Sequence, residues 1–154
     1  MRKRSKYRPR YNPLACMNAV IWSKPLDPHE AMPLKLTMRS NYEALRSGKG
    51  DSQSLQYTLV ALQSAYVMAI GIDASLAESL EPGIEAMCRV AERVARGKGY
   101  GIDADGLRDM PVALDVYEAI IDAASPKQLN DATREAYRRA FGHRLNYQPG
   151  MVRV

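Results

Sequence analysis

The sequence has few of the residues that build metal sites, disulfides and catalytic centres. Its 154 residues include two cysteines, two histidines, one tryptophan and one phenylalanine. Cys16 lies in an apolar stretch and Cys88 among apolar residues at helical spacing, so we expect both to pack as small reduced side chains. Two cysteines and two distant histidines do not supply the closely spaced ligands of a zinc site. We therefore predict no metal, no cofactor and no enzymatic activity.

The sequence also lacks an apolar run long enough to span a bilayer. The longest, Leu14–Trp22, covers nine residues and is interrupted by Asn18, whereas a spanning helix needs about 20. A basic start followed by an apolar run also suits a signal peptide, but Pro9, Pro13 and the absence of a small-residue cleavage site argue against one. We expect a cytoplasmic bacterial protein with no membrane partner.

Positive charge is concentrated at the N-terminus. Residues 1–10 hold six bases and no acid, whereas the rest of the chain holds 16 bases and 17 acids. Two prolines and mutual repulsion disfavour a helix, which predicts an extended arm over residues 1–13. Such an arm can neutralise phosphates while its tyrosines stack on bases; otherwise it serves as a solubilising tail or binds an acidic protein. The residues expected to bind DNA or RNA are Arg2, Lys3, Arg4, Lys6, Tyr7, Arg8, Arg10 and Tyr11.

The remainder is predicted to be all-α, an antiparallel bundle of about four main helices. Apolar residues recur at helical spacing in four segments joined by short loops. We expect the bundle over residues 51–142, capped at its start by Asp51 or Ser52, with its last helix beginning at Ser125-Pro126. Residues 143–154 are expected to form an irregular tail.

Local sequence predicts several boundaries inside the bundle. Ser75 and Glu78 match a capping box, which places a helix start there. Pro82 and Pro111 are expected near helix starts, because proline is tolerated in the first turn. Residues 97–101 contain three glycines and are predicted to be a mobile linker. Their Gly-Lys-Gly phrase has neither the preceding strand nor the following Ser/Thr of a phosphate loop.

Residues 14–50 are expected to pack on the bundle as a short helix followed by a proline-rich loop. The short helix covers residues 14–22, and three prolines predict a loop over residues 23–33. Residues 34–38 alternate apolar and polar side chains. That pattern suits either a brief strand or the start of a helix that runs to about Leu45.

Two arginines of the last helix are a second candidate for nucleic-acid binding. Arg134 and Arg138 lie one turn apart, so they can bind neighbouring phosphates. The simpler interpretation is a solvated face, since Glu135 and Arg139 form an ordinary i,i+4 pair.

Three carboxylates on another helix share one face. Asp115, Glu118 and Asp122 follow the spacing i, i+3, i+7. An exposed acidic face is the main interpretation. The alternatives are a divalent-ion site, an acid–base pair, or a surface that receives the basic arm of a neighbouring copy in a homo-oligomer.

The start of the chain resembles a group of phage proteins. Met1-Arg-Lys-Arg-Ser-Lys-Tyr-Arg-Pro9 is similar to the opening of small helical proteins encoded by bacteriophages and prophages of proteobacteria, some labelled Fis-like regulators. The stretch Arg-x-Asn-Tyr-Glu-Ala-Leu at 39–45 fits the same layout. The resemblance implies a phage-related origin and a host-cytoplasm setting, and it assigns no catalytic residue.

Together these features favour a non-enzymatic accessory protein of a phage or mobile element that binds nucleic acid through its arm. The alternative is a protein–protein interaction module, such as an inhibitor of a host system or an assembly factor, that uses the bundle surface.

Overall fold

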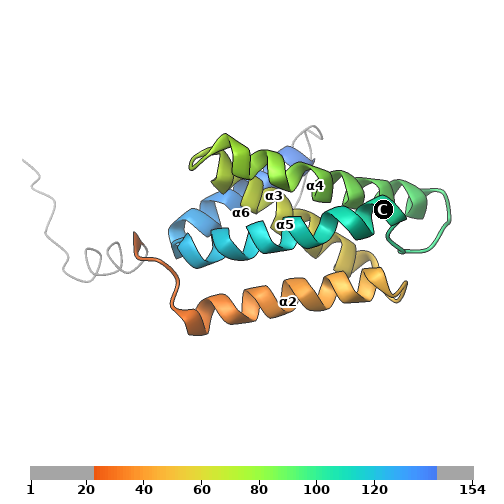
Figure 1. Ribbon diagram of the computed structural model, residues 1–154, viewed down its shortest axis with the longest axis horizontal. Helices are drawn as coiled ribbons and strands as arrows, with labels where there is room; N and C mark the ends of the chain where they lie inside the picture. Colours follow the sequence, from red (N-terminus) through yellow and green to blue (C-terminus); the bar gives the residue numbers. More distant parts are fainter. Residues whose placement is uncertain (1–22, 142–154) are drawn as a thin grey trace, which may run out of the picture.

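The computed structural model describes residues 23–141, and this part of the chain is helical without any strand. The helices are α2 (Pro28–Arg46), α3 (Ser52–Ile70), α4 (Ala74–Ala95), α5 (Ala104–Ala123) and α6 (Pro126–Phe141) (Figure 1). The all-α prediction is confirmed for these residues, with five helices in place of the expected four. The arm at 1–13 and the tail at 143–154 lie outside the described residues.

Helix α3 occupies the centre because it carries no charge. Its 19 residues include no Lys, Arg, Asp or Glu, so none of its faces has to reach water. The helix contacts each of the other four helices. Its buried hydroxyls donate to carbonyls one turn earlier, from Thr58 to Ser54 at 2.8 Å and from Ser64 to Val60 at 2.7 Å. These polar side chains are therefore satisfied inside the core.

Helix α2 replaces the predicted loop. Asp27 caps it by accepting the N–H of His29 at 2.9 Å and donating its own N–H to Glu30 at 3.2 Å, a capping box that starts the helix at Pro28. Met38 and Leu45 are completely buried. The loop prediction is thus wrong for residues 28–33 and so is the strand at 34–38, whereas the helix to Leu45 is confirmed.

Prolines lie inside helices where sequence reasoning placed helix starts. Helix α4 begins at Ala74 behind the cap Asp73, which accepts the N–H of Ser75 at 3.0 Å, and it continues through Pro82. Helix α5 continues through Pro111. Burial on both sides of each proline offsets the backbone hydrogen bond that the ring removes. The predicted cap Ser75 is wrong, because Asp73 caps α4. The predicted cap Asp51 is right, because it caps α3.

The last helix begins as expected. Ser125 Oγ accepts the N–H of Gln128 at 3.2 Å, and Gln128 Oε1 accepts the N–H of Ser125 at 3.0 Å. This reciprocal pair satisfies two backbone donors at the start of α6.

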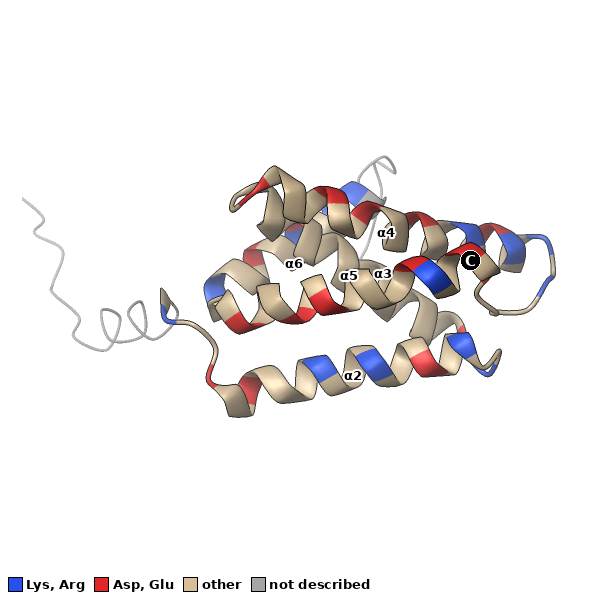
Figure 2. Cartoon of the chain, viewed as in Figure 1, with Lys and Arg blue, Asp and Glu red and all other residues tan. Residues whose placement is uncertain are grey.

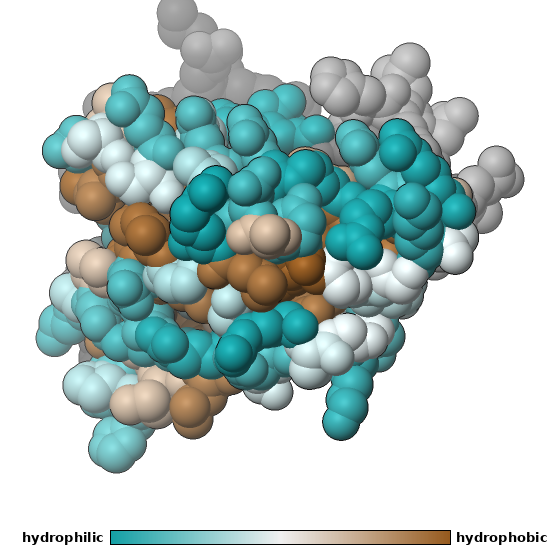
Figure 3. Space-filling view, turned by 45° about the vertical axis from the view of Figure 1, so that its right-hand side comes forward, coloured by the Kyte–Doolittle hydropathy of each residue, from teal (hydrophilic) through white to brown (hydrophobic). Residues whose placement is uncertain are grey.

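The described surface is mostly polar. On the face shown in Figure 3, hydrophobic side chains form a patch bordered by hydrophilic ones.

Cys88 is exposed, so the expectation that it packs in the core is wrong: α4 buries Leu80, Gly83, Met87 and Val90 instead. None of the described helices is long and apolar enough to cross a membrane.

Helices α4 and α5 pack closely at Gly83. A Cβ on this residue would lie 2.5 Å from the Cβ of Ala113 on α5 and 3.6 Å from Leu62 Cδ1 on α3. The helices must separate to admit such a methyl group, because the nearest atom, the Cβ of Ala113, is attached directly to the backbone of α5 and cannot move aside on its own.

Replacing Gly83 with alanine is therefore expected to destabilise the protein. The overpacking costs about 1–3 kcal/mol, and the better helix propensity of alanine returns about 1 kcal/mol. Urea denaturation of Gly83→Ala should show the net loss. Gly99→Ala is the matched control, since a Cβ there meets nothing within 4 Å. Equal stability of the two variants would contradict the close crossing.

Candidate nucleic-acid interface

The eight arm residues lie outside the described part of the chain, so their role stays a prediction. The charge of the part that is described bears on it. Residues 23–141 contain 14 Lys or Arg and all 17 Asp or Glu of the chain, a net charge of −3. The flanking residues 1–22 and 142–154 contain eight bases and no acid. The positive excess therefore belongs to the two ends of the chain.

Most cations of the helical body are already paired. Within residues 23–141, eight of the 14 Lys and Arg side chains form ion pairs with carboxylates. These are Lys35, Arg39, Arg46, Arg89, Arg108, Lys127, Arg138 and Arg139. A phosphate that approaches them has to compete with a carboxylate at close range.

The two α6 arginines differ in their surroundings. Arg138 holds Glu135 with both arms of its guanidinium, at 2.7 Å through Nε and 2.6 Å through Nη2, and Arg139 Nε adds a third bond at 2.8 Å. These bonds, that of Arg138 above all, lower the pKa of Glu135 to about 2. Arg134 is exposed and forms no ion pair within residues 23–141. Of the predicted pair, Arg134 is the one available to a phosphate.

The acidic face of α5 has a partner in the same chain. Arg39 of α2 binds Glu118 at 2.5 Å and approaches Asp115 at 3.6 Å, and Lys35 pairs with Asp122. Figure 2 shows the basic positions of α2 opposite the acidic positions of α5. No group of three or more potential ligands in the described residues is placed to hold a metal ion. The three carboxylates thus help to position α2, although Asp115 and Asp122 stay more than half exposed. The neighbouring-arm interpretation stays a prediction.

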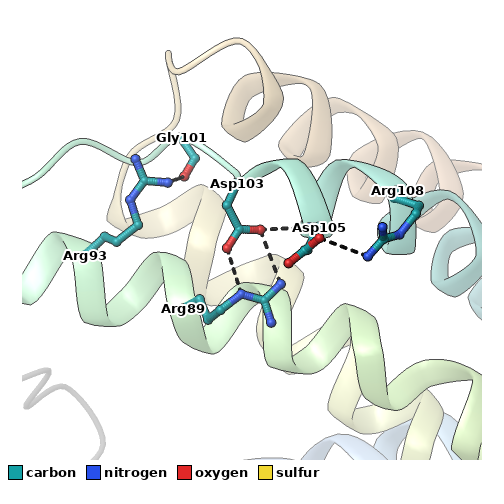
Figure 4. Close-up of polar contacts among 7 residues, drawn as sticks. Arg89, Arg93, Gly101, Asp103, Asp105 and Arg108 are labelled. Atoms are coloured by element: carbon teal, nitrogen blue, oxygen red, sulfur yellow. Dashed lines mark hydrogen bonds and ion pairs between the residues drawn. The ribbon is translucent and has the colours of Figure 1, made fainter.

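A second ion pair fixes the loop between α4 and α5. Arg89 binds Asp103 at 2.7 Å through Nε and 3.2 Å through Nη2, while Asp103 also accepts the N–H of Gly106 at 2.7 Å (Figure 4). Arg93 donates to the carbonyl of Gly101 at 2.9 Å. The hydrogen bond from Arg89 is the main reason that the pKa of Asp103 is lowered. The linker predicted to be mobile is therefore anchored at its end by both arginines.

Sequence reasoning missed a cluster of unpaired bases at one end of the bundle. Lys49, Arg96 and Lys98 are exposed and form no ion pair within the described residues. Helices α2 and α5 run antiparallel, as their ion pairs show, so the α2–α3 and α4–α5 turns lie at the same end (Figure 2). The sequence signal that could have revealed these bases is the phrase Gly-Lys-Gly, which occurs at both 48–50 and 97–99. A cation beside a helix C-terminus is also the arrangement that the helix dipole favours.

Comparison with known proteins finds no matching family model, curated protein or solved structure. The likeness of the first nine residues to phage-encoded proteins stays a prediction. Charge distribution and surface geometry are therefore the features of this chain that bear on its function.

The Arg89–Asp103 pair leads to a pH-dependent prediction. Because the folded pKa of Asp103 is lowered, its stabilisation is complete above the unfolded value of about 3.9 and is lost as the pH falls through the folded value. Asp103→Asn should therefore be less stable than the wild type at pH 7, and the difference should shrink below about pH 4. Urea denaturation of the wild type and the variant at pH 7 and at pH 3 measures the stability difference at each pH.

The capping residue Asp73 supplies the control. It caps α4 but has no arginine partner within residues 23–141. Asp73→Asn should cost less stability at pH 7 than Asp103→Asn, since it removes no ion pair. A loss for Asp103→Asn that is the same at both pH values would show that its charge contributes nothing.

Proposed function

We propose that this chain is a non-enzymatic accessory protein of a phage or mobile element that binds nucleic acid through residues 1–11. The separation of charge between the arm and the body supports the proposal. The arm places six cations within ten residues without a carboxylate, whereas the body carries a net charge of −3. Cations that are free of carboxylate partners release counterions from a phosphate backbone and gain affinity by doing so.

The negative body shapes the expected complex. Its excess of carboxylates repels a phosphate backbone at most points of the surface. The exceptions are Lys24, Arg134 and the cluster Lys49, Arg96 and Lys98, which are exposed and form no ion pair within the described residues. We therefore expect the arm to supply most of the affinity and these five side chains to add weaker contacts. Contacts to phosphates alone give little sequence selectivity.

Deleting residues 1–10 should remove most of the binding and most of its salt dependence. On B-DNA the logarithm of the binding constant falls by about 0.9 per phosphate contact for each tenfold rise in salt, so six contacts account for a slope of about 5. Fluorescence anisotropy on labelled duplex DNA and single-stranded RNA, over a salt series, measures both quantities. Circular dichroism should show unchanged helicity.

The cluster at the end of the bundle offers a matched comparison. A variant with Lys49→Ser, Arg96→Ser and Lys98→Ser removes three positive charges but keeps the arm. Its salt slope should fall by less than half of the loss caused by the deletion. Binding that survives the deletion with its salt slope unchanged would overturn the proposal.

A protein partner is the second candidate, and the outer face of α2 favours it. Met32 and Leu36 lie one turn apart and are 53% and 60% exposed. A pull-down after nuclease treatment, with the wild type, the arm deletion and the double variant Met32→Ser/Leu36→Ser, separates the two functions. A partner retained by the arm deletion and lost by the double variant supports this candidate.

A further inference from the structure

An apolar groove opens at the end of the bundle opposite the Gly-Lys-Gly turns. It has a volume of about 490 Å³ and lies between the C-terminal ends of α3 and α5 and the first turns of α6. Its apolar lining includes Val67, Met68, Ile72, Ile120, Ala123 and Ala132. Ile72 is 61% exposed, a large apolar side chain that the described residues leave in water. An unfilled apolar groove of this kind is a site where another apolar segment gains by burial.

The described chain begins at the edge of this groove. The backbone N–H of Leu26 donates to the carbonyl of Ala124 at 2.8 Å, and Ala124 lines the groove. Trp22 precedes Leu26 by four residues. Extended backbone covers at most about 3.5 Å per residue, so Trp22 lies within about 14 Å of this anchor. Any segment that ends at Trp22 is thus tethered beside the groove.

The tethered segment has the matching chemistry. Residues 14–22 read Leu-Ala-Cys-Met-Asn-Ala-Val-Ile-Trp, and only the asparagine among them is polar. The basic residues of the chain's N-terminus all lie before this run. An apolar segment on a short tether has a high effective concentration at the groove, which makes it a stronger competitor than an equivalent segment of another molecule.

We propose that residues 14–22 of this chain dock in the groove between α3, α5 and α6. The docked segment covers Ile72 and fixes the root of the basic arm beside α6. Asp131 lines the groove, and Arg134 follows it by three residues on the same side of the helix. The arm then starts on the side of the bundle where Arg134 lies, which forms no ion pair within residues 23–141. The two basic features then form one surface.

Trp22 makes the docking measurable, because it is the chain's only tryptophan. In the full-length protein its emission should be blue-shifted relative to the urea-unfolded chain, and acrylamide should quench it weakly. Ile72→Glu places a charge in the groove and should shift the emission to the red and raise the quenching towards the unfolded value. Helicity should not change, since Ile72 is exposed in a turn.

Val112→Glu is the matched control. Val112 is also an exposed apolar residue, 56% accessible, and it lies on α5 more than two turns from the groove. The Val112→Glu variant should leave the emission of Trp22 unaltered. If Ile72→Glu lowers helicity, Ala123→Glu repeats the test from the α5 side of the groove, where the side chain is exposed.

Two results would overturn the proposal. One is an emission of Trp22 that Ile72→Glu and Ala123→Glu leave unchanged. The other is a dimer mass by light scattering together with a concentration-dependent emission, which would assign the groove to the segment of a second copy. Neither readout involves nucleic acid, so docking and nucleic-acid binding succeed or fail separately.

Discussion

The uncharged helix α3 is the constraint on which the rest of the described structure depends. A helix of 19 residues without a charged side chain gains stability when other helices cover most of it. Helices α4 and α5 cover only part of it, since they also pack against each other around Gly83. Helices α2 and α6 cover much of the remaining surface of α3. Both of these helices carry charged residues on their outer faces, and α2 also exposes Met32 and Leu36 there. The requirement to cover α3 therefore determines where these charges are displayed.

The ion pairs between α2 and α5 follow from that requirement. Each partly exposed pair contributes only about 0.2–1 kcal/mol, whereas burying a side chain such as Met38 or Leu45 contributes about 1.5–3 kcal/mol. Apolar burial therefore holds α2 on the bundle, and Lys35 and Arg39 set its register along α5. These pairs engage the acidic face of α5 within the chain, while the side chains of Asp115 and Asp122 stay 78% and 57% exposed.

The sequence predicted the elements that depend on local chemistry and missed those that depend on distant contacts. Helical spacing located α3, α5 and α6, and the caps Asp51 and Ser125 were recognisable from neighbouring residues. The first turns of α2, residues 28–33, were missed because three prolines outweighed the box formed by Asp27 and Glu30, and because burial against α3 is invisible locally. The pairing of Arg39 with Glu118 joins residues 79 positions apart. Counting charges sufficed to show that positive charge is concentrated in residues 1–10. Only the antiparallel topology brings the two Gly-Lys-Gly turns to one end.

If the N-terminal residues bind nucleic acid as proposed, carboxylates of the same chain compete with the nucleic acid for their positive charges. Within residues 23–141, nine of the 17 carboxylates are in ion pairs and four others cap helices. The exposed carboxylates that do neither within residues 23–141 are Glu78, Glu81, Glu85 and Glu92 of α4. They spread four charges over about 21 Å of helix, whereas duplex DNA carries one charge per about 1.7 Å of its axis. The duplex is about threefold denser in charge and also releases condensed counterions. An arm that meets both surfaces therefore favours the nucleic acid, and α4 can only weaken that binding without replacing it.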